Sequence, residues 1–243
     1  LGDVYKRQVF GQACLFTTEP DHFIKLWRTW KRYLVNANLR STSAVLGFPR
    51  IGPQREVKKA LEAYWGDKIS AEELLKVAKE QRLNTYATIK EQGVDFVPTG
   101  TFSLYDHVLD MSNTLGIIPE AYATSGLSQL DTYFAMARGH QKGGVDLPAT
   151  EMKKWFDSNY HYLVPEFSEK SEFKLNDNKP VDDFIEAKEA GYNARPVILG
   201  PLTLLWLGKT SKDAQDPNFN RYSLLPKLAQ TYVPVSYTHL TLP

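Results

Sequence analysis

Short apolar segments alternate with long amphipathic stretches along most of this 243-residue chain, and this alternation limits the folds open to it. Apolar runs at 44–48, 94–97 and 195–199 each end at a proline or glycine, which is typical of buried strands. Residues 160–164 also carry a strand pattern. Strands separated by helices imply βαβ units, and hence a parallel sheet.

Helical spacing of apolar residues predicts the segments between the strands. The first helix is expected from about Pro53 to Trp65. Ser70 and Glu73 form a capping box at the start of a second helix that runs to Gly93. Further helical patterns occupy residues 102–109, 130–137, 180–191 and the stretch from 224 onward.

Parallel βα repeats build either a doubly wound sheet or a (β/α)8 barrel. No GxGxxG follows the first strand, which weakens the dinucleotide-binding version of the doubly wound sheet. About four strands are recognisable, roughly half the number that a closed barrel needs. The pattern therefore predicts an α/β fold and leaves open whether it is part of a barrel.

Composition and charge exclude several classes of protein. The formal net charge is +1, so the whole chain has no strong attraction for nucleic acid or an anionic membrane. The longest apolar run, 197–207, is interrupted by Gly200 and Pro201 and falls short of the roughly 18 residues of a membrane-spanning helix. Cys14 is the one cysteine, which excludes an internal disulfide and a multi-cysteine metal site. We expect no membrane or nucleic-acid partner.

The two ends differ from the body of the chain. Residues 1–42 carry seven basic and three acidic residues, and we expect them to be a leader foreign to the rest of the fold. Two other interpretations are an organelle transit peptide, which is rich in arginine and poor in acids, and a basic arm that binds an acidic partner. The tail, 236–243, completes no pattern, and we expect it to be foreign as well.

Four cations gather at the end of the first expected strand and the start of the following helix: Arg50, Arg55, Lys58 and Lys59. Sites in parallel α/β folds lie at such strand ends, and a helix N-terminus favours anions. A ligand with several carboxylates or phosphates would suit this cluster, although the commoner explanation is a solvated helix face. At about 100° per residue, Lys58 lies on the flank of the apolar face, whereas Arg55 and Lys59 point to solvent.

Residues 151–162 form a second candidate segment. An Asn159 amide suits the edge of a heterocycle or a carboxylate, but a turn that leads into a strand has the same composition. Lys153 and Lys154 precede two aromatic residues and would suit an anionic ligand with a ring; a surface turn anchored by the aromatics is equally consistent. No HExxH, GxSxG or P-loop sequence is present.

A series of longer motifs runs in order through about residues 45–235. They are LGFPRIG at 46–52, REVKK at 55–59, AYW at 63–65, YDHVLD at 105–110, FAMARG at 134–139, EMKKWFDSNYHY at 151–162, PEF at 165–167, FKL at 173–175 and RPVILGP at 195–201. Together they resemble the N-terminal half of the cobalamin-independent methionine synthase family, and its fungal members most closely.

This resemblance implies two (β/α)8 barrels placed face to face in a chain far longer than this one. Residues 43–235 would be a partial N-terminal folate-binding barrel, a TIM-type (β/α)8 fold truncated to about its first half. The family transfers a methyl group from 5-methyltetrahydropteroyl-polyglutamate to homocysteine, giving methionine, in the cytoplasm and without cobalamin. Its zinc ion and homocysteine bind the C-terminal barrel, so we expect neither ligand set here and no activity of this chain alone. The alternative is a non-catalytic barrel that binds folylpolyglutamate.

The resemblance also implies which residues contact the folate substrate. Lys58 and Asn159 correspond to contact positions in the family. Further positions match folate contacts of its bacterial members: Gln54, Arg55, Glu56, Val57 and Lys154. No catalytic or metal-binding residue is expected. Because the carboxylates of a polyglutamate tail suit a cationic helix start, the helix phase and the resemblance both favour Lys58.

Overall fold

The structure, a computed structural model, describes the backbone of residues 42–241 and the side chains of residues 42–235. The expected leader lies outside the described residues except for Thr42, and so do the side chains of the expected tail. The last helix, α10 (Leu225–Thr241), continues through most of that tail.

The first two helices are α3 (Glu56–Trp65) and α4 (Ala71–Glu91), which pack against each other. The capping box at Ser70 is confirmed. Helix α3 begins three residues after the expected Pro53 because Arg55 adopts a left-handed conformation with φ 63°, which a helix cannot include. The buried face of the pair joins a core that contains Val57, Leu61 and Leu74.

The parallel pairing expected from the sequence is present in two places. Strand β1 (Val97–Thr99) pairs with β7 (Ala194–Pro196), and β6 (Glu166–Phe167) pairs with β8 (Lys209–Thr210). The strand predicted at 44–48 is reduced to one parallel bridge between Ala44 and Phe96. Strand β1 was predicted at 94–97 and starts at the last of these residues. Strand β7 was predicted at 195–199 and ends three residues earlier than that.

The prediction of a strand at 160–164 was right in position but wrong in direction. Strand β5 (His161–Leu163) runs antiparallel to β4 (Met152–Lys154). The six residues between them are enough for a hairpin, whereas a parallel crossover needs about a dozen or more. A second hairpin joins β2 (His140–Lys142) to β3 (Val145–Leu147). Within residues 42–241 the strands form pairs and do not close into a barrel, so the architecture is mixed α/β.

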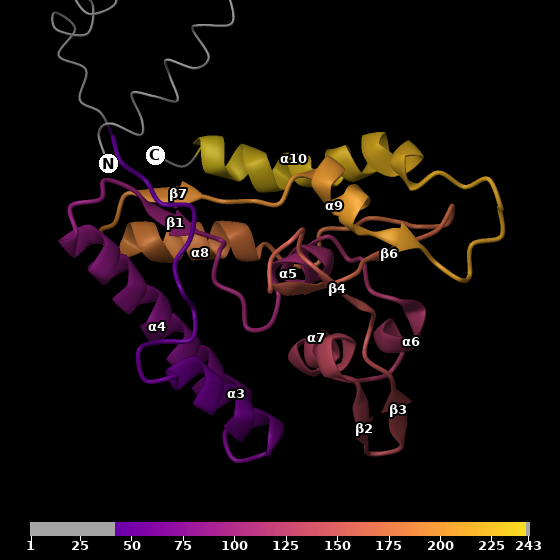
Figure 1. Cartoon of the computed structure of the whole chain (residues 1–243), viewed down its shortest axis with the longest axis horizontal. Helices are drawn as coiled ribbons and strands as arrows, with labels where there is room; N and C mark the ends of the chain where they lie inside the picture. The colour runs from indigo at the N-terminus through magenta and orange to yellow at the C-terminus, as the bar shows by residue number, and fades with distance from the viewer. Residues whose placement is uncertain (1–41, 242–243) are drawn as a thin grey trace, which may run out of the picture. The chain divides into compact units, whose positions relative to one another are not determined.

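Five further helices precede α10, and two of them, α7 and α8, match helices expected in the second half of the chain. The five are α5 (His107–Thr114), α6 (Glu120–Ala123), α7 (Gln129–Arg138), α8 (Lys179–Glu189) and α9 (Pro201–Leu207), with a 3₁₀ turn, η1 (Arg221–Leu224), before α10. Figure 1 shows α8 lying along β1 and β7, and α10 packs against α9 and α8. Helices α9 and α10 share a second core with β6, built on Phe167, Leu204 and Leu228.

The loop that follows β1 is the part of the fold that shapes the site. Gly100 has φ 78°, and a Cβ at this position would lie 2.8 Å from the carbonyl oxygen of Val197. Only glycine therefore allows β1 and the segment after β7 to approach this closely. The chain then passes from Gly100 to Asp106, which caps the N-terminus of α5.

Candidate functional site

A cleft of about 370 Å³ opens at the carboxyl end of β1. Its walls come from the segment after the Ala44 bridge, the loop after β1, the start of α5 and the turn between β4 and β5. The lining residues are Phe48, Pro49, Arg50, Thr101, Ser103, His107, Trp155 and Tyr160. Strand ends are where parallel α/β folds place their sites, so this cleft is the first candidate.

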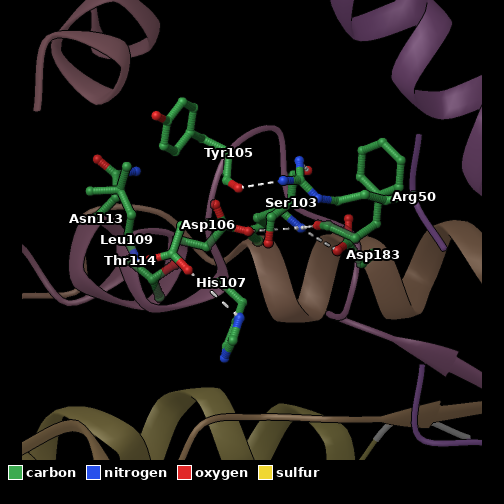
Figure 2. A network of polar contacts seen from close by, with 12 residues as sticks. Arg50, Ser103, Tyr105, Asp106, His107, Leu109, Asn113, Thr114 and Asp183 are labelled. Atoms are coloured by element: carbon green, nitrogen blue, oxygen red, sulfur yellow. Dashed lines mark hydrogen bonds and ion pairs between the residues drawn. The ribbon is translucent and has the colours of Figure 1, made fainter. Parts of the chain in front are cut away.

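The guanidinium of Arg50 is fixed by the main chain of the loop after β1. Its Nη1 donates to the carbonyl oxygen of Ser103 and its Nη2 to that of Tyr105, both at 2.6 Å. Figure 2 shows the side chain extended toward these two residues. Arg50 forms no ion pair with any other described residue, so its positive charge is held in place but not neutralised by a carboxylate.

Asp106 connects the loop, helix α5 and strand β5. Its side chain is 1% exposed. One oxygen accepts hydrogen bonds from the main-chain N–H groups of Leu109 and Leu163, at 2.9 and 3.1 Å, and the other accepts from the hydroxyl of Tyr160. Three donors thus satisfy both oxygens of this buried carboxyl group.

His107 lies beside this carboxylate and in contact with two aromatic rings. Its ring stacks on Tyr160 with centroids 5.3 Å apart and meets Trp155 edge-on at 4.6 Å. Its Nδ1 is 3.0 Å from the hydroxyl oxygen of Tyr160. Because that hydroxyl donates its proton to Asp106, it can only accept from His107, which places the proton of neutral His107 on Nδ1 and leaves Nε2 as an acceptor.

Burial sets the charge state of these rings. It lowers the pKa of His107, the nearby Arg50 lowers it further, and Asp106 partly opposes both. Burial also raises the pKa of the Tyr160 hydroxyl, with Asp106 adding to the effect. Near neutral pH the cleft therefore presents a neutral imidazole and a neutral phenol beside one fixed cation.

A second polar layer supports the loop from behind. The hydroxyl of Tyr133 accepts from the N–H groups of Tyr105 and Asp106 and donates to Asp110 at 2.6 Å. Burial raises the pKa of Asp110 to about 6. The ammonium of Lys179 lies 3.9 Å from Asp110 and donates to the carbonyl oxygen of Phe102 at 2.8 Å. These contacts hold the main chain on both sides of Ser103.

The residues predicted at the start of α3 do not line this cleft. Lys58 keeps 46% of its side-chain surface exposed and forms an ion pair with Glu62, 3.6 Å away on the next turn. Gln54 and Arg55 are exposed, and Glu56 uses its carboxylate to accept from the N–H of Gln54.

Val57 is fully buried in the core, and its N–H donates to Ile51. Its side chain is therefore not accessible to a ligand.

The two folate contacts predicted near the β4–β5 hairpin, Lys154 and Asn159, are both exposed. Lys154 lies in β4, paired with His161, and Asn159 lies in the turn, where its carbonyl oxygen is 3.1 Å from the Nδ1 of His161. Neither lines the cleft, although Tyr160 next to Asn159 does. Neither Ser103 nor Tyr160 was predicted as a site residue, although Tyr160 lies in the candidate segment 151–162. The signal that could have found them is their position in the loop after an expected strand end and in a polar turn.

Within residues 42–241, no three histidine, cysteine or acidic side chains cluster in a way that could hold a metal ion. None of the helices described there has the length and apolar character needed to cross a bilayer.

The pattern that defines the family "cobalamin-independent synthase, N-terminal domain" matches residues 42–238. The chain belongs to the cobalamin-independent methionine synthase family. Its likeness to curated members extends across fungi and bacteria, so the resemblance seen in the motifs is confirmed.

Three members illustrate the extent of the likeness. A protein of Schizosaccharomyces pombe named probable 5-methyltetrahydropteroyltriglutamate–homocysteine methyltransferase is 55% identical over 197 residues. Proteins with the same name, without the qualifier, are 52% identical in Saccharomyces cerevisiae and 50% identical in Chelativorans, each over 199 residues. The matches cover 78–79% of this chain but 25–26% of the relatives. The chain thus spans about a quarter of the length of the methyltransferases it matches.

Proposed function

We propose that this chain forms part of the N-terminal, folate-binding barrel of a methyltransferase that passes a methyl group from 5-methyltetrahydropteroyltriglutamate to homocysteine. The observation that carries the proposal is the family match over residues 42–238. The relatives are named for this reaction. The two parallel strand pairs and the parallel bridge at Ala44 are compatible with the first half of a (β/α)8 barrel.

Lys58 and Asn159 are the residues proposed to bind the polyglutamate tail, with Gln54, Arg55, Glu56, Val57 and Lys154 near it. The ammonium of Lys58 is exposed at the start of α3, and its one ion pair is an exposed i, i+4 contact. Such a pair contributes little to stability, so the ammonium is free to exchange its partner for a ligand carboxylate. Val57 would take part only in positioning, because its side chain is buried.

The chemistry itself is assigned to the part of the protein that this chain lacks. Zinc, which would bind homocysteine as a thiolate, needs a ligand cluster that residues 42–241 do not offer. We infer that the chain alone has no methyltransferase activity, needs no cobalamin, and belongs to a cytoplasmic enzyme. Methionine formation by the purified chain would contradict this assignment.

Titration of the purified chain with tetrahydropteroylglutamates carrying one or three glutamates tests the tail site. We expect Lys58→Ala to weaken the three-glutamate ligand about five- to ten-fold, since a charge-assisted hydrogen bond is lost, and to leave the one-glutamate ligand nearly unchanged. Lys59→Ala is the matched control, because Lys59 is an exposed lysine on the same helix. Equal losses for both ligands, or equal losses for both variants, would count against tail recognition by Lys58.

A further inference from the structure

The loop that follows β1 holds the guanidinium of Arg50 in the wall of the cleft. The two Nη atoms donate to the carbonyl oxygens of Ser103 and Tyr105, both at 2.6 Å. These two oxygens set the plane and the position of the guanidinium. A change in this short stretch of main chain therefore also changes how the charge of Arg50 is presented to the cleft.

Asp110 lies behind the same stretch and is linked to it through two hydroxyl groups. The hydroxyl of Tyr133 donates to Asp110 at 2.6 Å and accepts from the main-chain N–H groups of Tyr105 and Asp106, at 3.1 and 3.3 Å. The hydroxyl of Ser103 interacts with the same carboxyl group. The two links thus reach both residues whose carbonyl oxygens bind the guanidinium.

The charge of Asp110 is only partly compensated by its surroundings. Its side chain is 12% exposed, and its Oδ2 has no hydrogen bond of good geometry with any described residue. The ammonium of Lys179 is 3.9 Å away, but it donates to Asp183 at 2.5 Å and to the carbonyl oxygen of Phe102 at 2.8 Å. A carboxylate in this position depends mainly on the two hydroxyl groups.

The other charged groups near this carboxyl group do not change that conclusion. Arg82 of α4 is paired with Glu186 at 2.8 Å and lies 3.8 Å from Asp183. Burial raises the pKa of Asp110 to about 6 and Asp106 adds to the rise, whereas Lys179 and the two hydroxyl groups oppose it. The carboxyl group therefore exchanges its proton at a mildly acidic pH, where an unperturbed aspartate is already charged.

We propose that the proton on Asp110 controls how firmly the loop after β1 holds Arg50. In the charged state, the carboxylate accepts charge-assisted hydrogen bonds from the hydroxyl groups of Tyr133 and Ser103, which tighten the loop. When the carboxyl group takes up a proton, it becomes a donor to the oxygen of Ser103, and both links become weaker bonds between neutral groups. Burial of the charge costs stability of the whole fold, but the hydrogen bonds to it act locally on the loop.

This device goes beyond the proposed function, because it concerns the wall of the cleft and holds for whichever ligand the cleft takes. NMR of the guanidinium nitrogens of Arg50 tests it. A guanidinium held at both Nη atoms gives two separate Nη signals, and their exchange measures how fast the group rotates; Arg50→Lys, which lacks these signals, assigns them. We expect rotation to be about five-fold faster below about pH 5 than above about pH 7, because the two links lose their charge.

Asp110→Asn is the decisive variant. Its amide keeps an acceptor for the hydroxyl of Tyr133 and presents an N–H to Ser103, as the protonated acid would. The guanidinium of Arg50 should therefore rotate at the fast rate of the acidic wild-type chain at every pH. Asp146→Asn, on an exposed aspartate of the β2–β3 hairpin, is the matched control and should keep the wild-type dependence of the rotation rate on pH.

Three further variants separate the loop from other routes. Ser103→Ala and Tyr133→Phe each break one link while the carboxyl group remains, so each should reduce the dependence of the rotation rate on pH. His107→Asn removes the histidine that titrates beside Arg50 and keeps a donor toward the hydroxyl of Tyr160; the dependence should persist, with its midpoint near pH 6. Thermal unfolding of each variant shows whether the fold is retained.

A rotation rate of Arg50 that is constant with pH in the wild-type chain, or that still changes with pH in Asp110→Asn, would overturn the proposal. So would an unchanged dependence on pH in both Ser103→Ala and Tyr133→Phe, since the charge would then act on the guanidinium through space and not through the loop. None of these results bears on the tail site, which is measured by ligand binding to Lys58→Ala.

Discussion

The hydroxyl of Tyr160 donates a hydrogen bond to the carboxylate of Asp106, which lies 54 positions earlier in the chain. This contact joins the loop after β1 to the turn between β4 and β5, the two segments that form most of the cleft. The same carboxylate caps α5 and accepts from the N–H of Leu163 in β5. One buried acid thus fixes the relative position of a loop, a helix and a hairpin.

Asp106→Ala should therefore destabilise the chain by about 3 kcal/mol. The change leaves two main-chain N–H groups and one hydroxyl without an acceptor, at a residue that is 1% exposed. Hydrogen bonds to a carboxylate contribute more to the free energy of unfolding than hydrogen bonds between neutral groups. Urea unfolding measures the loss. Ser128→Ala removes the exposed cap of α7 and should cost about 1 kcal/mol; similar losses for the two variants would show that Asp106 acts only as a cap.

Asp110 should make the stability of the chain depend on pH. Burial raises its pKa from 3.8 to about 6, so the folded chain binds the proton more tightly than the unfolded chain. The stability contributed by this group is fully present below about pH 4 and is lost as the pH rises through about 6. Its side chain keeps 12% exposure, and solvent screening should limit the effect to about 2 kcal/mol.

Asp110→Asn removes this titration while it retains an acceptor for the hydroxyl of Tyr133. Relative to the wild-type chain, the variant should gain about 2 kcal/mol in free energy of unfolding between about pH 4 and about pH 7. Chemical unfolding at a series of pH values measures the difference. A constant difference across that range would mean that Asp110 has an ordinary pKa.

Arg82 holds α4 to α8 through a two-point ion pair with Glu186. Its Nε and Nη2 donate to the two carboxylate oxygens at 2.8 and 2.9 Å, and Asp183 lies 3.8 Å away. Arg82→Met keeps the apolar stem but leaves two poorly exposed carboxylates near each other, and should cost about 2–3 kcal/mol. Lys142→Met breaks an exposed pair with Asp67 and should cost less than about 0.5 kcal/mol. Equal effects would mean that water screens both pairs alike.

Helices were easier to predict from this sequence than strands. The apolar stripes of α3, α4, α7 and α8 are long enough to repeat, and the structure contains each helix within a few residues of its predicted range. The strands have two or three residues, so neither their bounds nor their direction could be derived from a local pattern. Helix α9 was missed because Gly200 and Pro201 were interpreted as stops, although proline is favoured in the first turn of a helix.

The cleft could be predicted only in part. Its general location follows from the rule that sites lie at strand ends, and Arg50 was among the candidate cations. The residues that Arg50 binds are 53 and 55 positions away, and nothing local to 46–52 indicates them. Ser103 is distinguished by its burial beside the carboxyl group of Asp110, which is a property of the packing and cannot be seen in the sequence.

Gly208 and Gly200, at the two ends of α9, provide a matched test of packing between α9 and β6. Both have ordinary negative φ values, −79° and −70°, so an added Cβ strains neither backbone. At Gly208 it would lie 2.3 Å from the ring of the fully buried Phe167 and 2.9 Å from the carbonyl oxygen of Pro165, whereas at Gly200 it meets no atom within 4 Å.

Gly208→Ala should consequently destabilise the chain by about 2–3 kcal/mol, because the ring of Phe167 is fully buried in a core cluster and can be displaced only by moving its neighbours. Gly200→Ala should change stability by less than about 1 kcal/mol, since the lower flexibility of the unfolded chain offsets a poorer helix cap. Thermal and urea unfolding of both variants measure the difference. Similar behaviour of the two would mean that the contact between Gly208 and Phe167 is looser than the structure shows.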